Sequence, residues 1–129
     1  MDKKENVKYW MVKNPLMVDY KTQIKNVAIL MNKKNISSVL VSENDKFIGI
    51  FTERDLVKYV ATSYNQPSLS IEKFFTKNPI CAQASEHYHN IEMKMKSHNI
   101  RHLPIMENNK LVGIVSMRDL LRYSQWTNS

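Results

Sequence analysis

The chain has 129 residues, 43% of them hydrophobic, and a formal net charge of +7, which allows one compact domain or two closely packed halves with a real core. No apolar run approaches the roughly 18–20 residues of a membrane span, and the charged start, residues 1–6, does not resemble a secretory signal. The single cysteine, Cys81, excludes an internal disulfide and fits a small buried residue in a reducing compartment, so we expect a cytoplasmic protein.

The first quarter of the chain predicts a short strand followed by a helix. Asn14-Pro15 predicts a turn into a short strand over residues 16–18. Apolar residues then recur at three- and four-residue spacing over residues 24–31, which indicates an amphipathic helix. Asn35 tolerates the left-handed conformation of a helix end, so we expect the helix to end near it.

A hairpin and a second helix are predicted next. Residues 39–41 and 47–51 are apolar runs separated by the turn residues Glu43-Asn44-Asp45-Lys46. Thr52 is expected to open the second helix. One face of that helix carries the apolar residues Leu56, Val57 and Val60.

These elements recur 64 residues later without a gap. Gly49-Ile50-Phe51-Thr52-Glu53-Arg54-Asp55-Leu56 is matched by Gly113-Ile114-Val115-Ser116-Met117-Arg118-Asp119-Leu120, and Asn14-Pro15 is matched by Asn78-Pro79. The second copy predicts a strand over 80–82, a helix lined by Tyr88, Ile91, Met93 and Met95, a hairpin of residues 103–105 and 111–115, and a final helix with Leu120, Leu121 and Tyr123.

The repeat sets the expected fold class and domain boundaries. We expect an α+β fold of two β-α-β-β-α repeats packed about a pseudo-twofold axis. The repeats are assigned to residues 7–61 and 71–123, joined by a polar linker over 62–70. The segment before each copy repeats as well, since Val7 and Trp10 correspond to Ile71 and Phe74.

The hydroxyl and carboxylate of Thr52-x-x-Asp55 and Ser116-x-x-Asp119 have two compatible interpretations. The first is a capping box that satisfies free amides at a helix start. The second is a ligand site, because a helix N-terminus with a hydroxyl attracts anions and a carboxylate one turn on accepts hydrogen bonds from a diol. The glycine three residues earlier lets a ligand or another backbone approach closely.

On these motifs the chain resembles a tandem pair of CBS domains (cystathionine β-synthase domains), a Bateman module, over nearly its whole length. The residues that carry the resemblance are Asn-Pro before the short strand, Ile100-Arg101-His102-Leu103-Pro104-Ile105, and the two matched octets. It looks most like the small stand-alone bacterial CBS pairs. Such modules sense AMP, ADP, ATP, NAD or S-adenosylmethionine and commonly form disk-like dimers.

The resemblance implies a set of nucleotide-binding residues. In the family the hydroxyl residue helps to hold phosphate, the Asp binds ribose hydroxyls, adenine lies between strands of the two copies, and basic residues before Leu-Pro contact phosphate. Carried over, these roles point to Thr52, Asp55, Ser116, Asp119, Arg101 and His102, with Leu16, Ile80 and Ser38 from the short strands and the hairpin.

The two copies differ at the positions that would hold phosphate. Ser37 and Ser38 replace Arg101 and His102, and Leu40 replaces Pro104. In the family each site combines the Thr and Asp of one copy with the short strand and hairpin of the other. The resemblance therefore implies that Arg101 and His102 serve the Thr52/Asp55 site. We predict tighter binding of a phosphorylated nucleotide there than at Ser116/Asp119.

Other residues leave alternatives open. Arg54 and Arg118 are solvated or dimer-interface residues, or a second phosphate clamp. Tyr20 and Ala84 stand where the family often has a proline. The tail after Ser124, with Trp126, is either frayed or folds back over an apolar patch.

Catalysis and metal binding are not expected. His87-x-His89 and His98-x-x-x-His102 have ligand-like spacing, but no Cys or carboxylate cluster completes a site. Cys81 has no charged sequence neighbour that would lower its pKa. No phosphate-binding loop is present, so we expect no enzyme and no catalytic cofactor.

We therefore expect a regulatory module that binds an adenosine-containing ligand, forms a homodimer and signals through a protein partner. The first alternative is a dimerising interaction scaffold in which Thr52 and Ser116 act only as caps. Nucleic-acid binding ranks last, because the excess of basic over acidic residues is spread evenly, 11 against 7 in residues 1–63 and 8 against 5 in residues 64–129. The sequence names neither the ligand nor the protein target.

Overall fold

The computed structural model describes the backbone of residues 6–127 and the side chains of residues 6–122. The predictions for Tyr123, Trp126 and the tail lie outside the described side chains. The chain divides into two compact units, described separately below. The first unit is residues 16–79, and the second unit is residues 6–15 together with 80–127.

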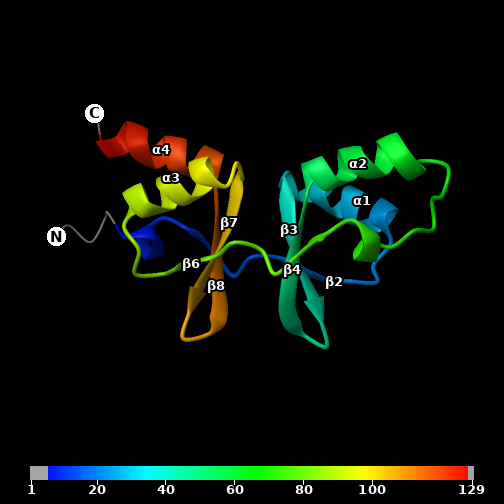
Figure 1. The fold of residues 1–129 in the computed structure, drawn as a ribbon, viewed down its shortest axis with the longest axis horizontal. Helices are drawn as coiled ribbons and strands as arrows, with labels where there is room; N and C mark the ends of the chain where they lie inside the picture. The colour runs from blue at the N-terminus through cyan, green and yellow to red at the C-terminus, as the bar shows by residue number, and fades with distance from the viewer. Residues whose placement is uncertain (1–5, 128–129) are drawn as a thin grey trace. The chain divides into compact units, whose positions relative to one another are not determined.

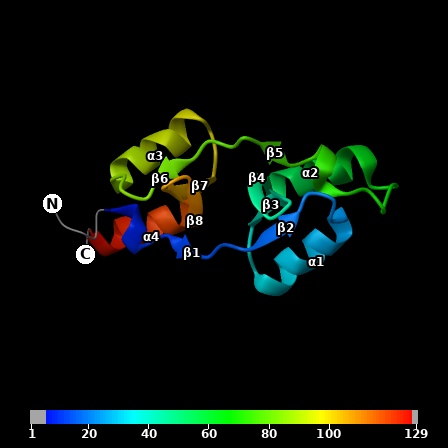
Figure 2. The same ribbon diagram turned by 90° about the horizontal axis from the view of Figure 1, so that it is seen from below.

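The first unit is a four-stranded sheet with two helices on one side of its hairpin (Figures 1 and 2). Its strand order is β2-β3-β4-β5, with β2 parallel to β3 and the other pairs antiparallel. The elements are β2 (Met17–Asp19), α1 (Ile24–Lys34), β3 (Ser38–Glu43), β4 (Lys46–Thr52), α2 (Glu53–Ser63), the 3-10 helix η3 (Ile71–Lys73) and β5 (Thr76–Lys77).

The second unit repeats this plan in the order β1-β8-β7-β6. Here β6 is parallel to β7, and the other two pairs are antiparallel. Its elements are the 3-10 helix η2 (Val7–Tyr9), β1 (Val12–Lys13), β6 (Ala82–Gln83), α3 (Tyr88–Ser97), β7 (His102–Glu107), β8 (Lys110–Ser116) and α4 (Met117–Thr127). The mixed α and β composition and the repeated plan confirm the predicted fold class.

The segment that precedes each copy packs with the other copy. β1 pairs with β8 of the second copy, and β5 pairs with β4 of the first. The chain therefore passes from one unit to the other just after Pro15 and just after Pro79. This division into packed units differs from the division into sequence repeats, since each unit borrows the lead-in of its counterpart.

Asparagine and aspartate, and not glycine, make the tight turns. Eight of the described residues have positive φ, and they form four pairs at the repeat offset: Asn14 with Asn78, Asn35 with Asn99, Asn44 with Asn108, and Asp45 with Asn109. Asn35 ends α1 in the left-handed conformation, which confirms the predicted helix end. Asn and Asp tolerate this conformation better than other non-glycine residues.

The two glycines serve close approach instead, since neither has a positive φ. A Cβ added to Gly49 would lie 2.3 Å from the carbonyl oxygen of Thr76. A Cβ on Gly113 would lie 2.4 Å from the Met11 sulfur and 2.9 Å from the Val12 carbonyl oxygen. The sequence left open whether the glycines admit a ligand or another backbone. In the structure they let another backbone, the borrowed strand, lie against the hairpin.

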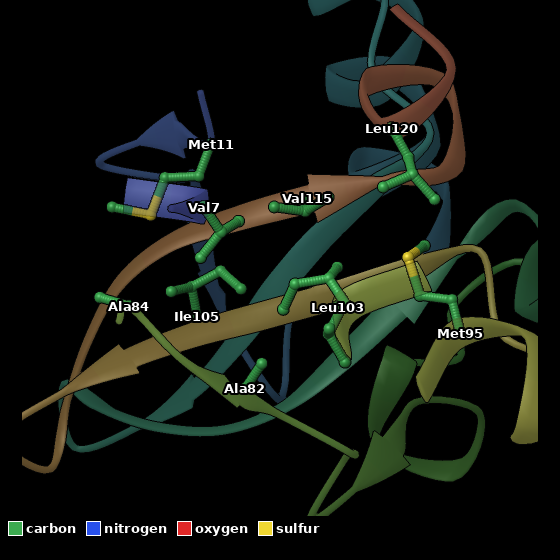
Figure 3. Close-up of a cluster of buried hydrophobic side chains, with 10 residues drawn as sticks. Val7, Met11, Ala82, Ala84, Met95, Leu103, Ile105, Val115 and Leu120 are labelled. Atoms are coloured by element: carbon green, nitrogen blue, oxygen red, sulfur yellow. The ribbon is translucent and has the colours of Figure 1, made fainter. Parts of the chain in front are cut away.

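Each unit has its own core, and the borrowed segment contributes to it. In the second unit Val7 is fully buried, and Figure 3 shows Val7 and Met11 beside Ile105 and Val115 of the hairpin. Ile71 has the same place in the first unit, where it is also fully buried. A complete core thus needs residues from both copies.

Several apolar predictions were wrong. Val57 and Val60 are 66% and 56% exposed, because the core-facing side of α2 is centred between Leu56 and Tyr59. Met93 is 68% exposed. It lies two positions after the buried Ile91, and residues two positions apart on a helix point to nearly opposite sides.

The short strands also begin later than predicted. They start at Met17 and Ala82 in place of residues 16 and 80. Leu16 and Ile80 therefore immediately precede their strands, and each is 38% exposed. Cys81, expected in the strand, lies just before it and is half-buried.

Candidate functional site

In both units a strand of the hairpin runs into a helix with no loop between them. Thr52 ends β4 and caps α2, and Ser116 ends β8 immediately before α4. The candidate hydroxyl and carboxylate of each copy therefore lie at a helix N-terminus fixed to the end of a sheet. This position provides backbone amides and a favourable dipole for a negative group.

In the first unit Thr52 and Asp55 form a capping box. The Thr52 N–H donates to Asp55 Oδ2 at 2.9 Å, and the Thr52 hydroxyl lies 3.4 Å from the same oxygen. In the described part of the chain both bonds of this carboxylate go to Oδ2. Oδ1 therefore retains its capacity to accept from a ligand.

In the second unit Ser116 and Asp119 make the same box with shorter side-chain bonds. The Ser116 N–H and hydroxyl donate to Asp119 Oδ2 at 2.9 and 3.0 Å, and the Ser116 hydroxyl accepts from the Asp119 N–H at 3.2 Å. Capping is thus established in both copies. It leaves the ligand interpretation open, because one carboxylate oxygen is not used by the cap.

Asp55 is the more unusual of the two carboxylates, because it is only 5% exposed. Burial raises its pKa above the ordinary value, and hydrogen bonds from Thr52 and the charges of Lys58 and Arg54 oppose that rise. Desolvation is the larger effect, as expected for a carboxylate withdrawn from water. A raised carboxylate pKa is typical of functional sites, although a structural cap also produces one.

The backbone before each hairpin satisfies the first helix amide. The Glu53 N–H donates to the Ser37 carbonyl at 3.1 Å, and the Met117 N–H donates to the Arg101 carbonyl at 2.8 Å. These contacts fix the residues before β3 and β7 beside the two capping boxes. No described residue accepts from the N–H groups of Arg54 or Arg118, so one amide at each helix start can meet an anion.

The predicted site residues fall into two sets, one in each unit. Ser38 lies opposite Thr52 in the β3–β4 register, and His102 lies opposite Ser116 in the β7–β8 register. Thr52, Asp55, Leu16 and Ser38 belong to the first unit, whereas Ser116, Asp119, Arg101, His102 and Ile80 belong to the second. The predicted pairing of Thr52 and Asp55 with Arg101 and His102 joins residues of different units and stays a prediction.

Arg54 and Arg118, for which the sequence allowed a solvated or dimer-interface position or a phosphate clamp, are both exposed at the first turn of their helices. Arg101, just before β7, is exposed as well. Exposure is compatible with each of the roles considered for them.

The histidines of the sequence motifs have local roles. His87 caps α3, since its Nδ1 accepts from the His89 N–H at 3.1 Å, and the two rings stack. The spacing of His98 and His102 is not helical, because α3 ends at Ser97 and His102 lies in β7. The described residues contain no group of three or more His, Cys, Asp or Glu side chains placed to hold a metal ion.

The Cys81 thiol shows no sign of activation. Burial raises its pKa, and the charge of Lys94 only partly opposes this. A raised thiol pKa lowers the fraction of reactive thiolate.

Sequence reasoning missed one polar cluster next to Ile80. Lys94 Nζ donates to the Cys81 carbonyl at 3.1 Å and to Glu86 Oε2 at 3.2 Å. Comparison of the copies could have found it, because Leu30 and Thr22 stand at the corresponding positions. A lysine in place of a leucine, between the matching pairs Asn26/Asn90 and Met31/Met95, indicates a new polar contact.

A family model for the CBS domain matches the chain twice, over residues 6–62 and 71–125. Among solved structures, the chain is similar to an uncharacterized conserved protein from Pyrococcus horikoshii, with 31% identity, a TM-score of 0.87, and coverage of 97% of this chain and 96% of that one. It is also similar to the CBS domain pair of protein MJ0100, solved in complex with 5′-methylthioadenosine and S-adenosyl-L-methionine. There the identity is 28%, the TM-score 0.85, and the coverage 95% and 97%.

Curated relatives include a homoserine O-acetyltransferase from Methanosphaera stadtmanae, 35% identical over 115 residues. That match covers 88% of this chain and 23% of the relative, so the chain spans about a quarter of that protein's length. Across the described residues, none of the helices has both the length and the apolar character needed to cross a bilayer.

Proposed function

Because the chain belongs to the CBS domain family and carries two copies of that domain, we propose that it is a regulatory module that binds an adenosine-containing ligand. The ligand class comprises AMP, ADP, ATP, NAD and S-adenosylmethionine. In this proposal the module has no catalytic activity of its own. It signals through a protein partner or through a change of oligomer.

The observation that carries this proposal is the buried Asp55 carboxylate at a helix start. Thr52 uses only one of its oxygens, and the other can accept a hydrogen bond from a ribose hydroxyl. Such a bond to an ionised acceptor is stronger than one between neutral groups. Asp119 has the same arrangement in the second unit, which gives the proposal a second candidate site.

The comparison with MJ0100 supports the ligand class. Its CBS domain pair was solved with two adenosine derivatives, and its whole fold is shared with this chain. The name homoserine O-acetyltransferase belongs to a much longer relative.

We further propose that phosphorylated ligands distinguish the two candidate sites. Arg101 and His102 are cationic or can become so, whereas Ser37 and Ser38 at the matching positions are neutral. The resemblance assigns this pair to the Asp55 site. If that assignment holds, Arg101→Ala weakens AMP binding at the Asp55 site and leaves adenosine binding there nearly unchanged.

A scaffold without a ligand is the second candidate function. It is favoured by the finding that both hydroxyl–carboxylate pairs are complete capping boxes, which accounts for these residues without a ligand. The two functions differ in what loss of the carboxylate does. A scaffold loses only stability, whereas a sensor also loses its response to the ligand.

The deciding experiment measures thermal unfolding with AMP, ADP, ATP, NAD, S-adenosylmethionine and 5′-methylthioadenosine. A ligand at a hundred times its Kd adds about 2.7 kcal/mol to the free energy of unfolding, which raises Tm by roughly 10 °C in a domain of this size. For wild type, Asp55→Ala and the matched Asp119→Ala, the Tm with each ligand is compared with the Tm of the same protein without ligand. The loss of stability caused by the missing cap therefore does not enter the comparison. If no compound raises the Tm, the sensor function is refuted and the scaffold without a ligand remains.

The homodimer is also a proposal. Val57 and Val60 on α2, and Tyr64 directly after its end, are spaced by three and four residues and are 66%, 56% and 74% exposed. This apolar stripe offers a surface for a second copy of the chain. We expect Val57→Lys with Val60→Lys to lower the mass measured by light scattering to that of a monomer, and Met93→Lys on α3 to leave it unchanged.

A further inference from the structure

In the second unit the lead-in, residues 6–13, is held against the start of α3. Asn6 pairs with His87 in an isolated antiparallel bridge. The Val7 N–H donates to the Glu86 carbonyl at 3.1 Å, and the Val7 side chain is fully buried in the core (Figure 3). The geometry of this helix start therefore affects how firmly the lead-in is held.

The first unit holds its lead-in with the same backbone contacts. Ser70 pairs with Gln23, and the Ile71 N–H donates to the Thr22 carbonyl at 2.9 Å. Each of these residues lies 64 positions from its counterpart in the second unit. The first unit is therefore an internal reference for the second.

The side chain at the helix start differs between the two units. His87 caps α3, because its Nδ1 accepts from the His89 N–H at 3.1 Å. Within the described part of the chain, Gln23 at the matching position makes no side-chain capping bond to α1. A neutral imidazole has one acceptor nitrogen, so this bond places the His87 proton on Nε2. Protonation of Nδ1 turns the acceptor into a second donor and breaks the cap.

His89 adds a second ionisable ring at the same place. The His87 and His89 rings stack with their centroids 4.9 Å apart and their planes 9° apart. Tyr88 lies beside both rings, at 5.4 and 4.2 Å between centroids. Two imidazolium rings in this arrangement repel each other, and their charge opposes the positive end of the helix dipole. Protonation of the pair therefore weakens the helix start beyond the loss of the cap.

The carboxylates beside this helix start are already paired. Glu86, directly before the cap, is bound through Oε2 to Lys94 at 3.2 Å and to the Gln83 N–H at 2.6 Å. Lys8 of the lead-in pairs with Glu107 of β7 at 3.2 Å. Each carboxylate is therefore shared with a lysine. The other described charged or titratable groups on the lead-in, on α3 and on β7 and α4, which pack against α3, are Tyr9, Lys13, Glu92, Lys96, His98, His102, Arg118, Asp119 and Arg122.

We infer that His87 and His89 form a pH-sensitive latch on the N-terminal lead-in of the second unit. At high pH the neutral His87 ring caps α3 and the lead-in is held. Histidine ordinarily titrates between about pH 8 and 5, and as pH falls through this range the contribution of the cap is lost. Residues 6–13 then open more often. The lead-in of the first unit lacks this response, because Gln23 does not titrate.

Opening of the lead-in changes the second unit in a defined way. It withdraws Val7 and Met11 from the core and leaves the edge of β8 at Gly113 and Ile114 without its partner strand. The first unit keeps its own lead-in. The latch therefore lets pH act on one unit of the chain and not on the other.

The test measures hydrogen exchange of the full chain at about pH 7.5 and about pH 5.5, on either side of the ordinary histidine midpoint. Protection factors are compared, so that the intrinsic pH dependence of exchange cancels. The Val7 N–H reports on the latched lead-in, and the Ile71 N–H reports on the reference. Loss of a side-chain cap corresponds to about a fivefold change in an opening equilibrium. We expect Val7 protection to fall by about this factor at the lower pH and Ile71 protection to stay constant.

Substitution of the cap separates the latch from a general effect of pH. His87→Asn keeps a good capping acceptor that does not titrate, and we expect it to remove the pH dependence at Val7. His98→Gln is the matched control, because His98 lies at the other end of α3, where its Nδ1 is 2.9 Å from the Lys94 carbonyl. This variant should keep the fall in Val7 protection.

His87→Ser repeats the test if asparagine disturbs the helix start, since serine is also a good cap that does not titrate. A fall in Val7 protection that persists in both His87 variants, or that is matched at Ile71 in wild type, overturns the inference. Nitrogen NMR of the imidazole rings adds an independent readout. It should place the proton of neutral His87 on Nε2, and a proton on Nδ1 would refute the latch.

Discussion

The two units share a backbone framework but differ in the groups that stabilise it near the candidate sites. All four pairs of left-handed Asn or Asp residues and both close-approach glycines recur at the same offset. The residues next to the capping boxes do not recur, since Ser37 and Ser38 are replaced by Arg101 and His102. The repeated positions are those that the fold requires, and the unmatched positions are where the copies are free to acquire different binding properties.

The borrowed strands add a second lesson. Each unit takes its edge strand and one fully buried side chain from the lead-in of the other copy. Neither sequence repeat therefore contains the whole of one core. This interdependence makes the two lead-ins the most direct place to compare the units.

The largest effect is expected from truncation of the borrowed side chains. Ile71→Ala removes a fully buried side chain from the first unit and is expected to lower the free energy of unfolding by about 3–4 kcal/mol. Val7→Ala, its counterpart in the second unit, removes one carbon atom fewer and is expected to cost about 2 kcal/mol. Urea denaturation measures both values.

Hydrogen exchange shows which unit each substitution affects. Ile71 lies in the second sequence repeat but packs in the first unit, so Ile71→Ala should accelerate exchange in β3 and β4. Val7→Ala should do so in β7 and β8. Acceleration of β7 and β8 by Ile71→Ala would contradict the exchange of lead-ins.

The next largest effect is expected at the glycines. An added Cβ at Gly49 meets the Thr76 backbone at 2.3 Å, and a backbone cannot rotate away. At Gly113 the nearest atom is the flexible Met11 sulfur at 2.4 Å. We expect Gly49→Ala to destabilise by about 3 kcal/mol and Gly113→Ala by about half as much.

Thermal unfolding of both glycine variants ranks them. In a Met11→Ala background, which makes room for the new methyl group, Gly113→Ala should cost less free energy of unfolding than it does in wild type. A Gly113→Ala variant that is less stable than Gly49→Ala would show that the Val12 backbone, at 2.9 Å, is the harder obstacle.

Substitutions at the two helix caps should lower the free energy of unfolding by less than the glycine substitutions do. Ser116 makes two side-chain bonds at 3.0 and 3.2 Å, whereas the Thr52 hydroxyl lies 3.4 Å from its carboxylate partner. We expect Ser116→Ala to cost about 1 kcal/mol and Thr52→Ala about half of that. Denaturant titration of both variants without ligand checks the order, and Thr52→Ser and Ser116→Thr should preserve the caps.

Much of this framework could be predicted from the sequence, because local chemistry determines it. Asn35 predicted a helix end, and Thr52 predicted a helix start. The exchange of lead-ins could not be predicted, because Val7 and Ile71 carry no mark of which hairpin they cover. The exposure of Val57 and Val60 was missed because helical spacing alone does not show where the core-facing side is centred.

The candidate site was predictable to a similar degree. The repeated hydroxyl–carboxylate spacing indicated both boxes, and the structure confirms their capping bonds. Burial of Asp55 depends on tertiary packing and has no signature in that spacing. The contact between Lys94 and Cys81 belongs to no motif, and only the replacement of Leu30 by Lys94 between the copies points to it.

The smallest effect is expected from the titration of Asp55, and it can be predicted in sign. Burial raises the pKa of this carboxyl in the folded protein, so the folded state holds a proton where the unfolded state, with a pKa of about 3.9, has lost it. Stability contributed by Asp55 therefore falls as pH rises from the unfolded to the folded pKa and is constant above it. Asp55→Asn removes the titration, so the difference in unfolding free energy between wild type and variant should fall across that window. A difference that rises with pH would mean that Thr52, Lys58 and Arg54 outweigh desolvation.

AMP binding to wild type should change in the opposite sense, strengthening across the same window, because the ionised carboxylate is the better acceptor for a ribose hydroxyl.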